Sequence, residues 1–255
     1  MDSGVSEVAK ALLSARRSGK VADTEPLLDA LQGAEDAYAV QALVAAQLRW
    51  HSGPVANYWK SGGASRDAII THAGLPPEGV RHSPADLRQW PLHLHGIEAE
   101  IAIRLGCDVN DEMLRTASEL DARGWISDFT VAIEVISNHW SRGYDTPKWL
   151  KLADLQSHGA LVLAQWQPWR EHGWANQECK ITVNDQVVVS CKGSLPLGSP
   201  DWGLRTFARH VIGGHRILPK GTVVTTGSWN GIYRAKAGDA VRVEFTGLGS
   251  AQVQL

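Results

Sequence analysis

The first 50 residues carry two apolar patterns with helical spacing. In the earlier one, apolar residues recur every three or four positions up to Gly19, a residue that favours a helix end. The later one, over residues 34–50, is rich in strong helix formers and keeps a stripe of apolar residues. The apolar residues of the two patterns are Val5, Val8, Ala9, Leu12 and Leu13, then Tyr38, Leu43, Val44 and Leu48. They predict an N-terminal helical segment over residues 1–53.

From residue 54 onward the pattern changes to short runs of alternating apolar and polar residues, separated by Gly and Pro. The predicted strands are residues 55–60, 97–105, 129–136, 179–190, 222–227 and 240–247. Within the run 179–190, Asn184-Asp185 predicts a hairpin turn. Two helices are expected near residues 112–122 and 200–213. Because no repeat or flexible linker interrupts the chain, we expect an α+β protein with one compact β-rich body, residues 54–255.

The stretch from Gly96 to Gly106 reads as a half-buried strand that carries two glutamates. Successive side chains of a strand point to opposite faces, so Glu98 and Glu100 share one face, about 7 Å apart along the backbone. Like charges at this spacing repel each other, and glutamate is depleted in strands. One explanation is a solvated outer face on which Arg104 reduces the repulsion. The other is a cluster of functional carboxylates.

A third glutamate, Glu134, lies in the apolar run TVAIEVI. A carboxylate in apolar surroundings is unfavourable unless a partner compensates it. A buried ion pair with Arg or Lys would compensate it. If Glu134 instead converges with Glu98 and Glu100, three carboxylates favour a hard divalent cation, Mg²⁺ or Mn²⁺, with Ca²⁺ as a further candidate.

The composition excludes several kinds of partner. The net charge of -2 gives no basis for binding nucleic acid or an acidic membrane, and no run approaches the roughly 18 apolar residues of a membrane span. The three cysteines are odd in number and form no C-x-x-C, which argues against a disulfide framework and for a reducing compartment. The start of the chain lacks the apolar core of a secretory signal. We therefore expect a cytoplasmic protein.

Five segments of the chain resemble the fumarylacetoacetate hydrolase superfamily, in particular its 2-oxopent-4-enoate hydratase and 4-oxalocrotonate decarboxylase branch. They follow the family's order over residues 34–255: AEDAYAVQ, NYWKSGG, IEAEIAIRLG, VAIEVI and LPKGTVVTTGS…KAGDAVRVEFTGLGS. The resemblance implies the superfamily's β-rich mixed-sheet roll, a divalent metal ion and a homo-oligomer. It also implies small-molecule substrates, namely 2-oxo or 2-hydroxydienoic acids of aromatic catabolism.

Carried over residue by residue, the resemblance implies that Glu98, Glu100 and Glu134 ligate the metal. Lys60, in YWKSG, would reach the oxyanion of the substrate as a partly desolvated amine with a lowered pKa. Without the family pattern, Lys60 would read as a surface lysine. Ser228 would face the substrate carboxylate, although a Gly-Ser pair is equally typical of a turn.

The chain departs from the branch in two loops. VISNHW follows the third glutamate where the branch has IVDSR, and ADLQS at residues 153–157 stands where ADN is usual. Asp154 and Gln156 are therefore candidates to line the pocket, although Asp154 is equally suited to cap a helix or turn. Glu78 is a candidate catalytic acid, although its loop is equally typical of a solvated turn. These changes keep the metal ligands and leave the substrate and the reaction open.

The resemblance implies a metal-dependent hydratase, a lyase that adds water to a 2-hydroxy-2,4-dienoate and gives a 4-hydroxy-2-oxo acid. Glu78 or Asp154 would be the base that positions the water. The nearest alternative is a 2-oxo diacid decarboxylase of the 4-oxalocrotonate type, with Arg142 as an anchor for the second carboxylate. A C–C hydrolase of acylpyruvates is a third reading. A non-catalytic binding protein of the same fold is the alternative from another class.

Overall fold

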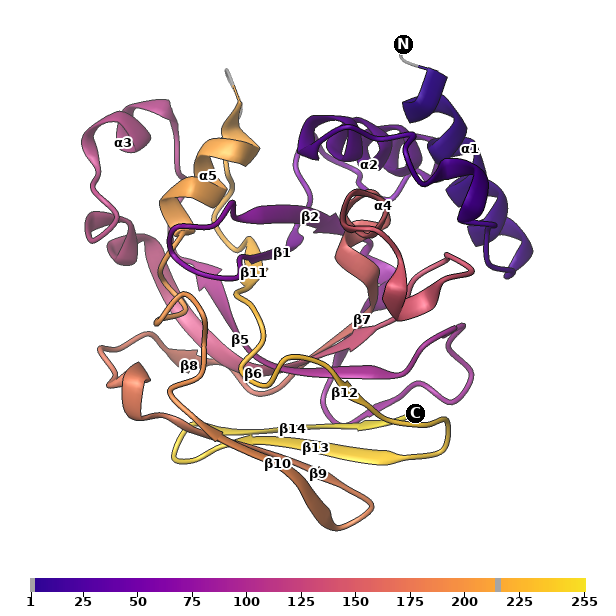
Figure 1. The fold of residues 1–255 in the computed structure, drawn as a ribbon. Helices are drawn as coiled ribbons and strands as arrows, with labels where there is room; N and C mark the ends of the chain where they lie inside the picture. The colour runs from indigo at the N-terminus through magenta and orange to yellow at the C-terminus, as the bar shows by residue number, and fades with distance from the viewer. Residues whose placement is uncertain (1–2, 214–216) are drawn as a thin grey trace.

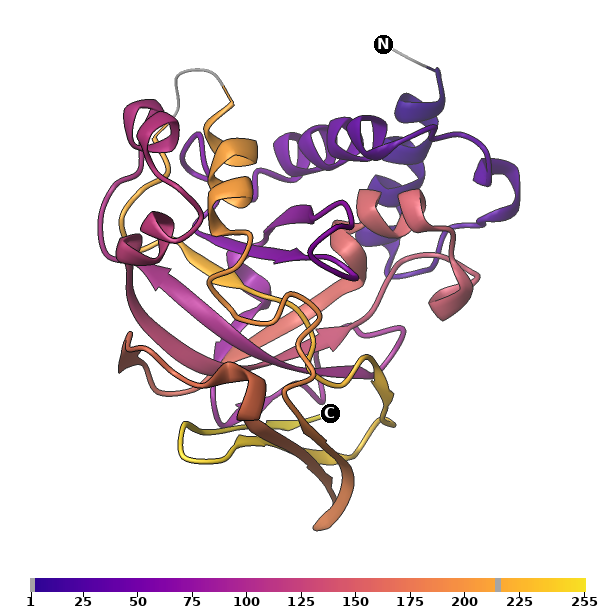
Figure 2. The same cartoon turned by 60° about the vertical axis from the view of Figure 1, so that its left-hand side comes forward.

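The computed structural model describes residues 3–213 and 217–255, which form two stacked β-sheets below a layer of helices (Figures 1 and 2). The α-helices are α1 Ser3–Ser18, α2 Ala34–Leu48, α3 Asp111–Thr116, α4 Lys148–Ala153 and α5 Leu204–Ile212. The short 3-10 turns are η1 Glu25–Leu27, η2 Pro77–Gly79, η3 Asp121–Trp125, η4 Gly143–Asp145, η5 Leu155–Ser157 and η6 Trp174–Asn176.

The strands divide between a larger and a smaller sheet. Those of the larger sheet are β1 Tyr58–Gly62, β2 Thr71–Leu75, β3 Val80–His82, β5 Gly96–Leu105, β6 Ile126–Ile136, β7 His158–Leu163, β8 Gln167–Pro168, β11 Val223–Thr225 and β12 Tyr233–Arg234. Those of the smaller sheet are β4 Ala85–Asp86, β9 Glu178–Val183, β10 Gln186–Lys192, β13 Ala240–Phe245 and β14 Gly249–Gln254. The expected α+β class with a curled mixed sheet is confirmed.

The larger sheet runs in the order β2-β1-β11-β5-β6-β7-β3, with the long antiparallel pair β5–β6 at its centre. It is mixed because β1 lies parallel to β11 and β3 lies parallel to β7. The alternation predicted for β5 holds, since Ile101 and Ile103 face the core between the sheets and Ala102 belongs to the cluster on the opposite face. Both faces of β5 are covered, so the expectation of a half-buried strand is wrong.

The main hydrophobic core lies between the two sheets. Side chains of β5 and β6 meet those of β9 and β13, for example Ile101 and Val131 on one side and Ile181 and Val243 on the other. The predicted hairpin between β9 and β10 is confirmed. Its Asn184-Asp185 turn has positive φ angles of 47° and 65°, as a two-residue hairpin turn of the favoured type requires.

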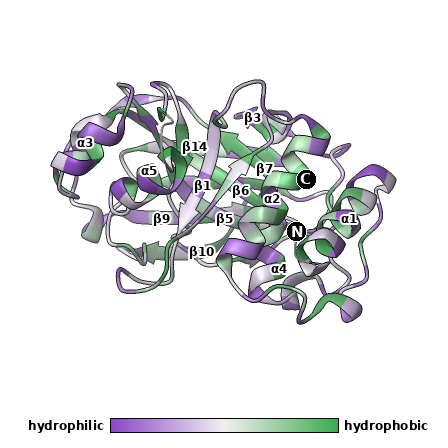
Figure 3. Ribbon diagram, turned by 90° about the horizontal axis from the view of Figure 1, so that it is seen from above, coloured by the Kyte–Doolittle hydropathy of each residue, from purple (hydrophilic) through white to green (hydrophobic). Residues whose placement is uncertain are grey.

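The helices form two groups on the side of the larger sheet that faces away from the smaller sheet (Figure 1). Seen from above, α1, α2 and α4 lie together at one end, and α3 and α5 lie at the other (Figure 3). Helix α1 ends as predicted, since Gly19 has a φ of 69° and its N–H donates to the carbonyl of Ala15. Both α1 and α2 fall within the segment 1–53, and the division of the chain at residue 53 stays a prediction. Within the described residues, no helix is both long enough and apolar enough to cross a bilayer.

Candidate active site

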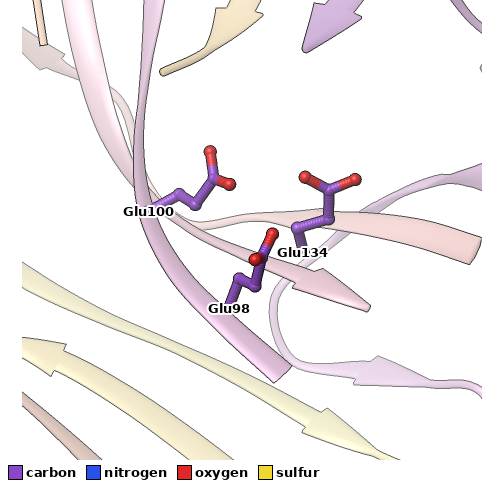
Figure 4. A group of neighbouring side chains, drawn as sticks. All are labelled: Glu98, Glu100 and Glu134. Atoms are coloured by element: carbon purple, nitrogen blue, oxygen red, sulfur yellow. The ribbon is translucent and has the colours of Figure 1, made fainter. Parts of the chain in front are cut away.

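Three glutamates from two neighbouring strands point into one space on the helix side of the larger sheet (Figure 4). The antiparallel register of β5 and β6 places Glu98 directly opposite Glu134, and Glu100 follows two residues later on the same face of β5. One carboxylate oxygen of each glutamate lies within 4.8 Å of one oxygen of each of the others. Because directly opposed like charges destabilise a sheet, this arrangement indicates a cation-binding function.

The surroundings of the carboxylates make their combined charge unfavourable without a cation. Glu100 and Glu134 are buried, and Glu98 is half-buried. Burial raises the pKa of Glu98 to about 7, with the Lys60 ammonium opposing this shift and the Glu134 charge adding to it. Burial, followed by the charges of Glu134 and Glu98, raises the pKa of Glu100 well above its usual range. A divalent ion would offset this repulsion.

The hydrogen bonds of the cluster leave oxygens available for such an ion. Oε1 of Glu134 lies 2.6 Å from Nζ of Lys60 and 3.2 Å from Nδ1 of His158, whereas the buried Oε2 has no partner among the described residues. Oε2 of Glu100 accepts from the N–H of Gly227 at 2.9 Å and from the hydroxyl of Thr225. A buried oxygen without a donor calls for an explanation, and a hard divalent cation, which prefers carboxylate oxygens, provides one. The cluster therefore fits the predicted metal.

Lys60 lies at the centre of this cluster rather than at the surface. Its ammonium donates to Glu134 and, at 3.1 Å, to the carbonyl of Gln156. Burial lowers the pKa of Lys60, but the charges of the three nearby glutamates outweigh burial and hold the pKa above its usual value. The expectation of a lowered pKa is therefore wrong. The buried ion pair considered for Glu134 does exist, with Lys60 as the partner, next to the candidate metal site.

A pocket of about 400 Å³ opens beside the glutamates. The predicted residues Lys60, Gln156 and Ser228 line it together with Glu98 and Glu100. The hydroxyl of Ser228 donates to the carbonyl of Gly231 at 2.7 Å, so it takes part in its own turn as well as facing the pocket.

Gln156 lies at the middle of a strained turn on the pocket wall. Leu155, Gln156 and Ser157 all have positive φ angles, of 54°, 55° and 62°. Non-glycine residues rarely adopt this region, and such strain is found mainly at functional sites. The turn directs the Gln156 carbonyl to Lys60 and the Gln156 amide nitrogen to the hydroxyl of Thr71.

Asp154 lies outside the pocket. Its fully buried carboxylate pairs with Arg16 of α1 at 2.6 Å and accepts from the backbone N–H of His139 at 2.7 Å. Burial raises the pKa of Asp154, but the charges of Arg16 and His139 and the bonds from His139 outweigh burial and hold the pKa well below its usual range. Its side chain caps neither adjacent helix. Asp154 thus joins α1 to the loop after β6, and we assign it a structural role.

Two further candidates also lie away from the pocket. Glu78 is exposed in η2 and borders a separate cavity of about 100 Å³. Arg142 pairs with the exposed Glu25 at 2.7 Å. Neither residue is part of the wall of the pocket beside the three glutamates.

We predict that Asp154→Asn lowers the free energy of unfolding by about 3 kcal/mol at pH 7, because it removes the fully buried partner of the largely covered Arg16. An acid whose pKa is depressed in the folded state stabilises the fold above its unfolded pKa of about 3.9, and this contribution is lost as the pH falls below that value. The difference from wild type should therefore shrink in acid. Urea unfolding at pH 7 and at lower pH measures it.

The matched control is Asp128→Asn, which breaks the half-exposed ion pair with Arg104. Exposed pairs contribute up to about 1 kcal/mol, so this variant should change stability little. Equal losses for the two variants would contradict a special role for Asp154.

The sequence also matches a known family model. The model described as fumarylacetoacetate (FAA) hydrolase C-terminal matches residues 76–255. This protein belongs to the fumarylacetoacetate hydrolase family. By sequence alone, no curated protein matches the chain. The predicted family is confirmed.

Several solved structures share the fold. 4-Oxalocrotonate decarboxylase from Pseudomonas putida G7, complexed with magnesium and adipate, superimposes with a TM-score of 0.82 at 18% identity over 98% of this chain and 96% of that chain. Fumarylpyruvate hydrolase from Pseudomonas aeruginosa, in complex with Mn²⁺ and pyruvate, has a TM-score of 0.58 at 13% identity over 78% of this chain and 89% of that chain. 2-Hydroxyhepta-2,4-diene-1,7-dioate isomerase from Mycobacterium marinum has a TM-score of 0.59 at 16% identity over 78% of this chain and 74% of that chain. Two of these structures contain a divalent ion, Mg²⁺ or Mn²⁺, and the three glutamates of this chain can hold one.

Proposed function

We propose that this protein is a divalent-metal-dependent lyase that decarboxylates a 2-oxo-3-enedioate, which is a vinylogous 2-oxo diacid. The observation that carries the proposal is the placement of the charged side chains. The pocket contains two lysines, one at the glutamates and one on its wall, whereas Glu78 and Asp154 lie elsewhere. Decarboxylation is therefore favoured over the hydration that the sequence suggested first.

Hydration requires a base that positions and activates water. Among the described residues that line the pocket, the carboxylates are Glu98 and Glu100, which are both candidate metal ligands. The two bases considered from the sequence are an exposed turn residue, Glu78, and the buried partner of Arg16, Asp154. Loss of CO₂ needs no activated water, so the pocket suits decarboxylation better. The same consideration disfavours an acylpyruvate hydrolase.

A second cation on the pocket wall supports a diacid substrate. Lys151 of α4 lines the pocket, and its Nζ donates to the carbonyl of Tyr144 at 2.6 Å. An ammonium has three protons, so two remain for a carboxylate of the substrate. Lys151 takes the role that the sequence suggested for Arg142, which is paired with Glu25. The P. putida decarboxylase structure contains adipate, a dicarboxylate, in agreement with a substrate of this kind.

The proposed reaction divides between the two ends of the pocket. The C1 carboxylate and the C2 oxo group of the substrate would lie at Glu98, Glu100 and Glu134. A divalent ion bound there would act as a Lewis acid for the developing oxygen charge. Lys60, beside the same carboxylates, adds a fixed positive charge for the C2 oxygen.

At the other end Lys151 would bind the distal carboxylate in the ground state. The bond between that carboxylate and its methylene breaks, and the electron pair moves through the double bond to the C2 oxygen. CO₂ leaves, and protonation of the oxygen gives a 2-hydroxydienoate. Because CO₂ is neutral, the ion pair with Lys151 is lost in this step, so Lys151 contributes to binding rather than to the rate of bond breaking.

Incubation of the purified protein and Mg²⁺ with 2-oxohex-3-enedioate should release CO₂ and form the ultraviolet chromophore of a 2-hydroxydienoate. A second reaction starts from 2-hydroxypenta-2,4-dienoate, and a third from an acylpyruvate. Loss of the dienoate chromophore in the second reaction, with no CO₂ released in the first, would identify a hydratase instead. Cleavage of the acylpyruvate alone would identify a hydrolase. No turnover of any compound, with Mg²⁺ bound, would favour the binding protein.

We predict that Lys151→Met raises the KM for the diacid about tenfold or more and changes kcat less than about threefold, since a hydrogen bond to a charged group contributes about 1.5–3 kcal/mol. The control is Lys148→Met on the same helix. Lys148 lies over the ring of Trp149 and borders a different cavity, so its removal should leave KM unchanged. Steady-state kinetics measure both variants. A fall in kcat with KM unchanged would remove Lys151 from substrate binding.

We further propose that the protein is a cytoplasmic homo-oligomer. The three cysteines are free thiols, which suits a reducing compartment, and the family resemblance implies the oligomer. Light scattering of the purified protein tests the oligomer, and a monomeric mass at micromolar concentration would contradict it.

A further inference from the structure

We propose that His158 is a positioning residue of the metal site. Its Nδ1–H holds Oε1 of Glu134 so that Oε2 of the same carboxylate remains directed at the cation. This inference rests on the metal-binding part of the proposed function and does not depend on which reaction follows.

The contacts of His158 define its tautomer. It is the first residue of β7 and pairs with Ile136, next to the bulge that follows Glu134 on β6. Its side chain is 2% exposed, and its polar contact is the one from Nδ1 to Oε1 of Glu134 at 3.2 Å. An ionised carboxylate only accepts hydrogen bonds. Nδ1 therefore carries the proton, and Nε2, which has no partner among the described residues, carries the lone pair.

The ring is enclosed in this orientation. A Cβ added at Gly79 would lie 3.2 Å from Nε2 of His158, so the far edge of the imidazole faces the backbone of η2, and both residues border the small cavity of about 100 Å³. A side chain that is 2% exposed has little freedom to turn, so it limits the orientations of the carboxylate that it contacts. Partners of this kind orient the ligands of metal sites.

His158 can hold Glu134 in a way that Lys60 cannot. Both side chains donate to the same oxygen, Oε1, at 3.2 and 2.6 Å. The Lys60 ammonium is charged, so a divalent cation that binds at Glu134 repels it. A second proton on the buried Nε2 would find no acceptor among the described residues, so the imidazole carries one ring proton and is neutral. The bond from His158 therefore persists when the cation is bound.

Three substitutions of His158 test the proposal. Asn keeps an N–H on the atom attached to Cγ, where Nδ1 of histidine lies. Leu has a comparable size and no donor, and Gln places its amide one bond farther from the backbone. Calorimetric titration with Mg²⁺, without substrate, measures the dissociation constant. We expect His158→Leu to weaken Mg²⁺ binding about 10- to 100-fold, and His158→Asn to stay within about threefold of wild type.

Melting temperatures of the variants in chelator separate weaker Mg²⁺ binding from a general loss of stability. If His158→Leu does not fold, the comparison between Asn and Gln still decides, with weaker binding expected for Gln. Wild-type Mg²⁺ affinity in a folded Leu or Gln variant, or equal weakening in Asn and Gln, would overturn the proposal. NMR of the ¹⁵N-labelled imidazole should show a protonated Nδ1, and a protonated Nε2 would overturn it as well. Since the titration uses no substrate, failure of the decarboxylase assay leaves this result intact.

Discussion

Glu98→Gln should lower Mg²⁺ affinity at least about 100-fold and abolish turnover, while the metal-free protein becomes no less stable. The side chain of Glu98 makes no hydrogen bond to any other described residue, so the substitution removes charge without breaking a bond within the protein. Its raised pKa, about 7, indicates that the folded protein disfavours the ionised form. At pH 8 the amide should therefore leave the melting temperature in chelator unchanged or raise it. Loss of one carboxylate ligand of three accounts for the loss of affinity.

With saturating Mg²⁺ the order of stability should reverse. A ligand that binds the folded state alone raises stability by about 2.7 kcal/mol at 100 times its dissociation constant, and the wild type gains this while Glu98→Gln does not. Differential scanning calorimetry with chelator and with Mg²⁺ shows the reversal. The control is Glu244→Gln, which alters an exposed pair with Arg242 and should behave as wild type under both conditions.

The metal-free wild type should still melt cooperatively, because the main core lies between the two sheets and does not include the glutamates. A small zinc module behaves differently, since it unfolds without its metal. Mg²⁺ binding by Glu98→Gln with normal affinity would refute the three-carboxylate site.

Local patterns in the sequence were sufficient for the elements that carry the glutamates. Period-two alternation placed Glu98 and Glu100 on one face of β5, and the buried position of Glu134 followed from its apolar neighbours. The register that sets Glu98 opposite Glu134 is a contact between distant segments, and no local pattern determines it. The family resemblance supplied that convergence.

Strand β7, and with it His158, was not predicted from the sequence. The run after His158 is GALVL, a short apolar stretch, which periodicity alone cannot assign to a strand. The turn before it contains three non-glycine residues with positive φ, which local propensity disfavours. His158 would have been found only by knowing that β7 pairs with β6.

Asp154 was misplaced for a related reason. Its place in ADLQS, where the resembled branch has ADN, suggested a pocket residue, with a helix or turn cap as the alternative. Its partner Arg16 lies 138 residues earlier in the chain, and helix α1 reaches it only because α1, α2 and α4 pack together. Ion pairs between distant elements follow from the packing of helices, which a single sequence does not specify.

Lys60→Met should lower turnover about 10²-fold or more, the scale of losing one donor to a developing oxyanion. The sequence alone suggested that this lysine need not hold the metal, so that metal affinity would stay nearly unchanged. The 2.6 Å ion pair with Glu134 refines that expectation. Removal of a positive charge beside the site should allow Mg²⁺ to bind at least as tightly as in wild type at pH 8.5, where protons compete least.

The metal-free Lys60→Met protein should be the least stable form. Breaking a buried ion pair destabilises by about 3–5 kcal/mol, and Mg²⁺ should restore most of this loss because it replaces the missing positive charge. Lys60→Arg should keep the stability of the wild type because it keeps the positive charge. It should not restore the wild-type turnover, since a planar guanidinium does not reproduce a compact ammonium. Calorimetric titration, melting with and without Mg²⁺, and steady-state kinetics measure the three effects. Weaker Mg²⁺ binding in Lys60→Met would show that the lysine positions Glu134 for the cation, and near-normal turnover would remove it from the chemistry.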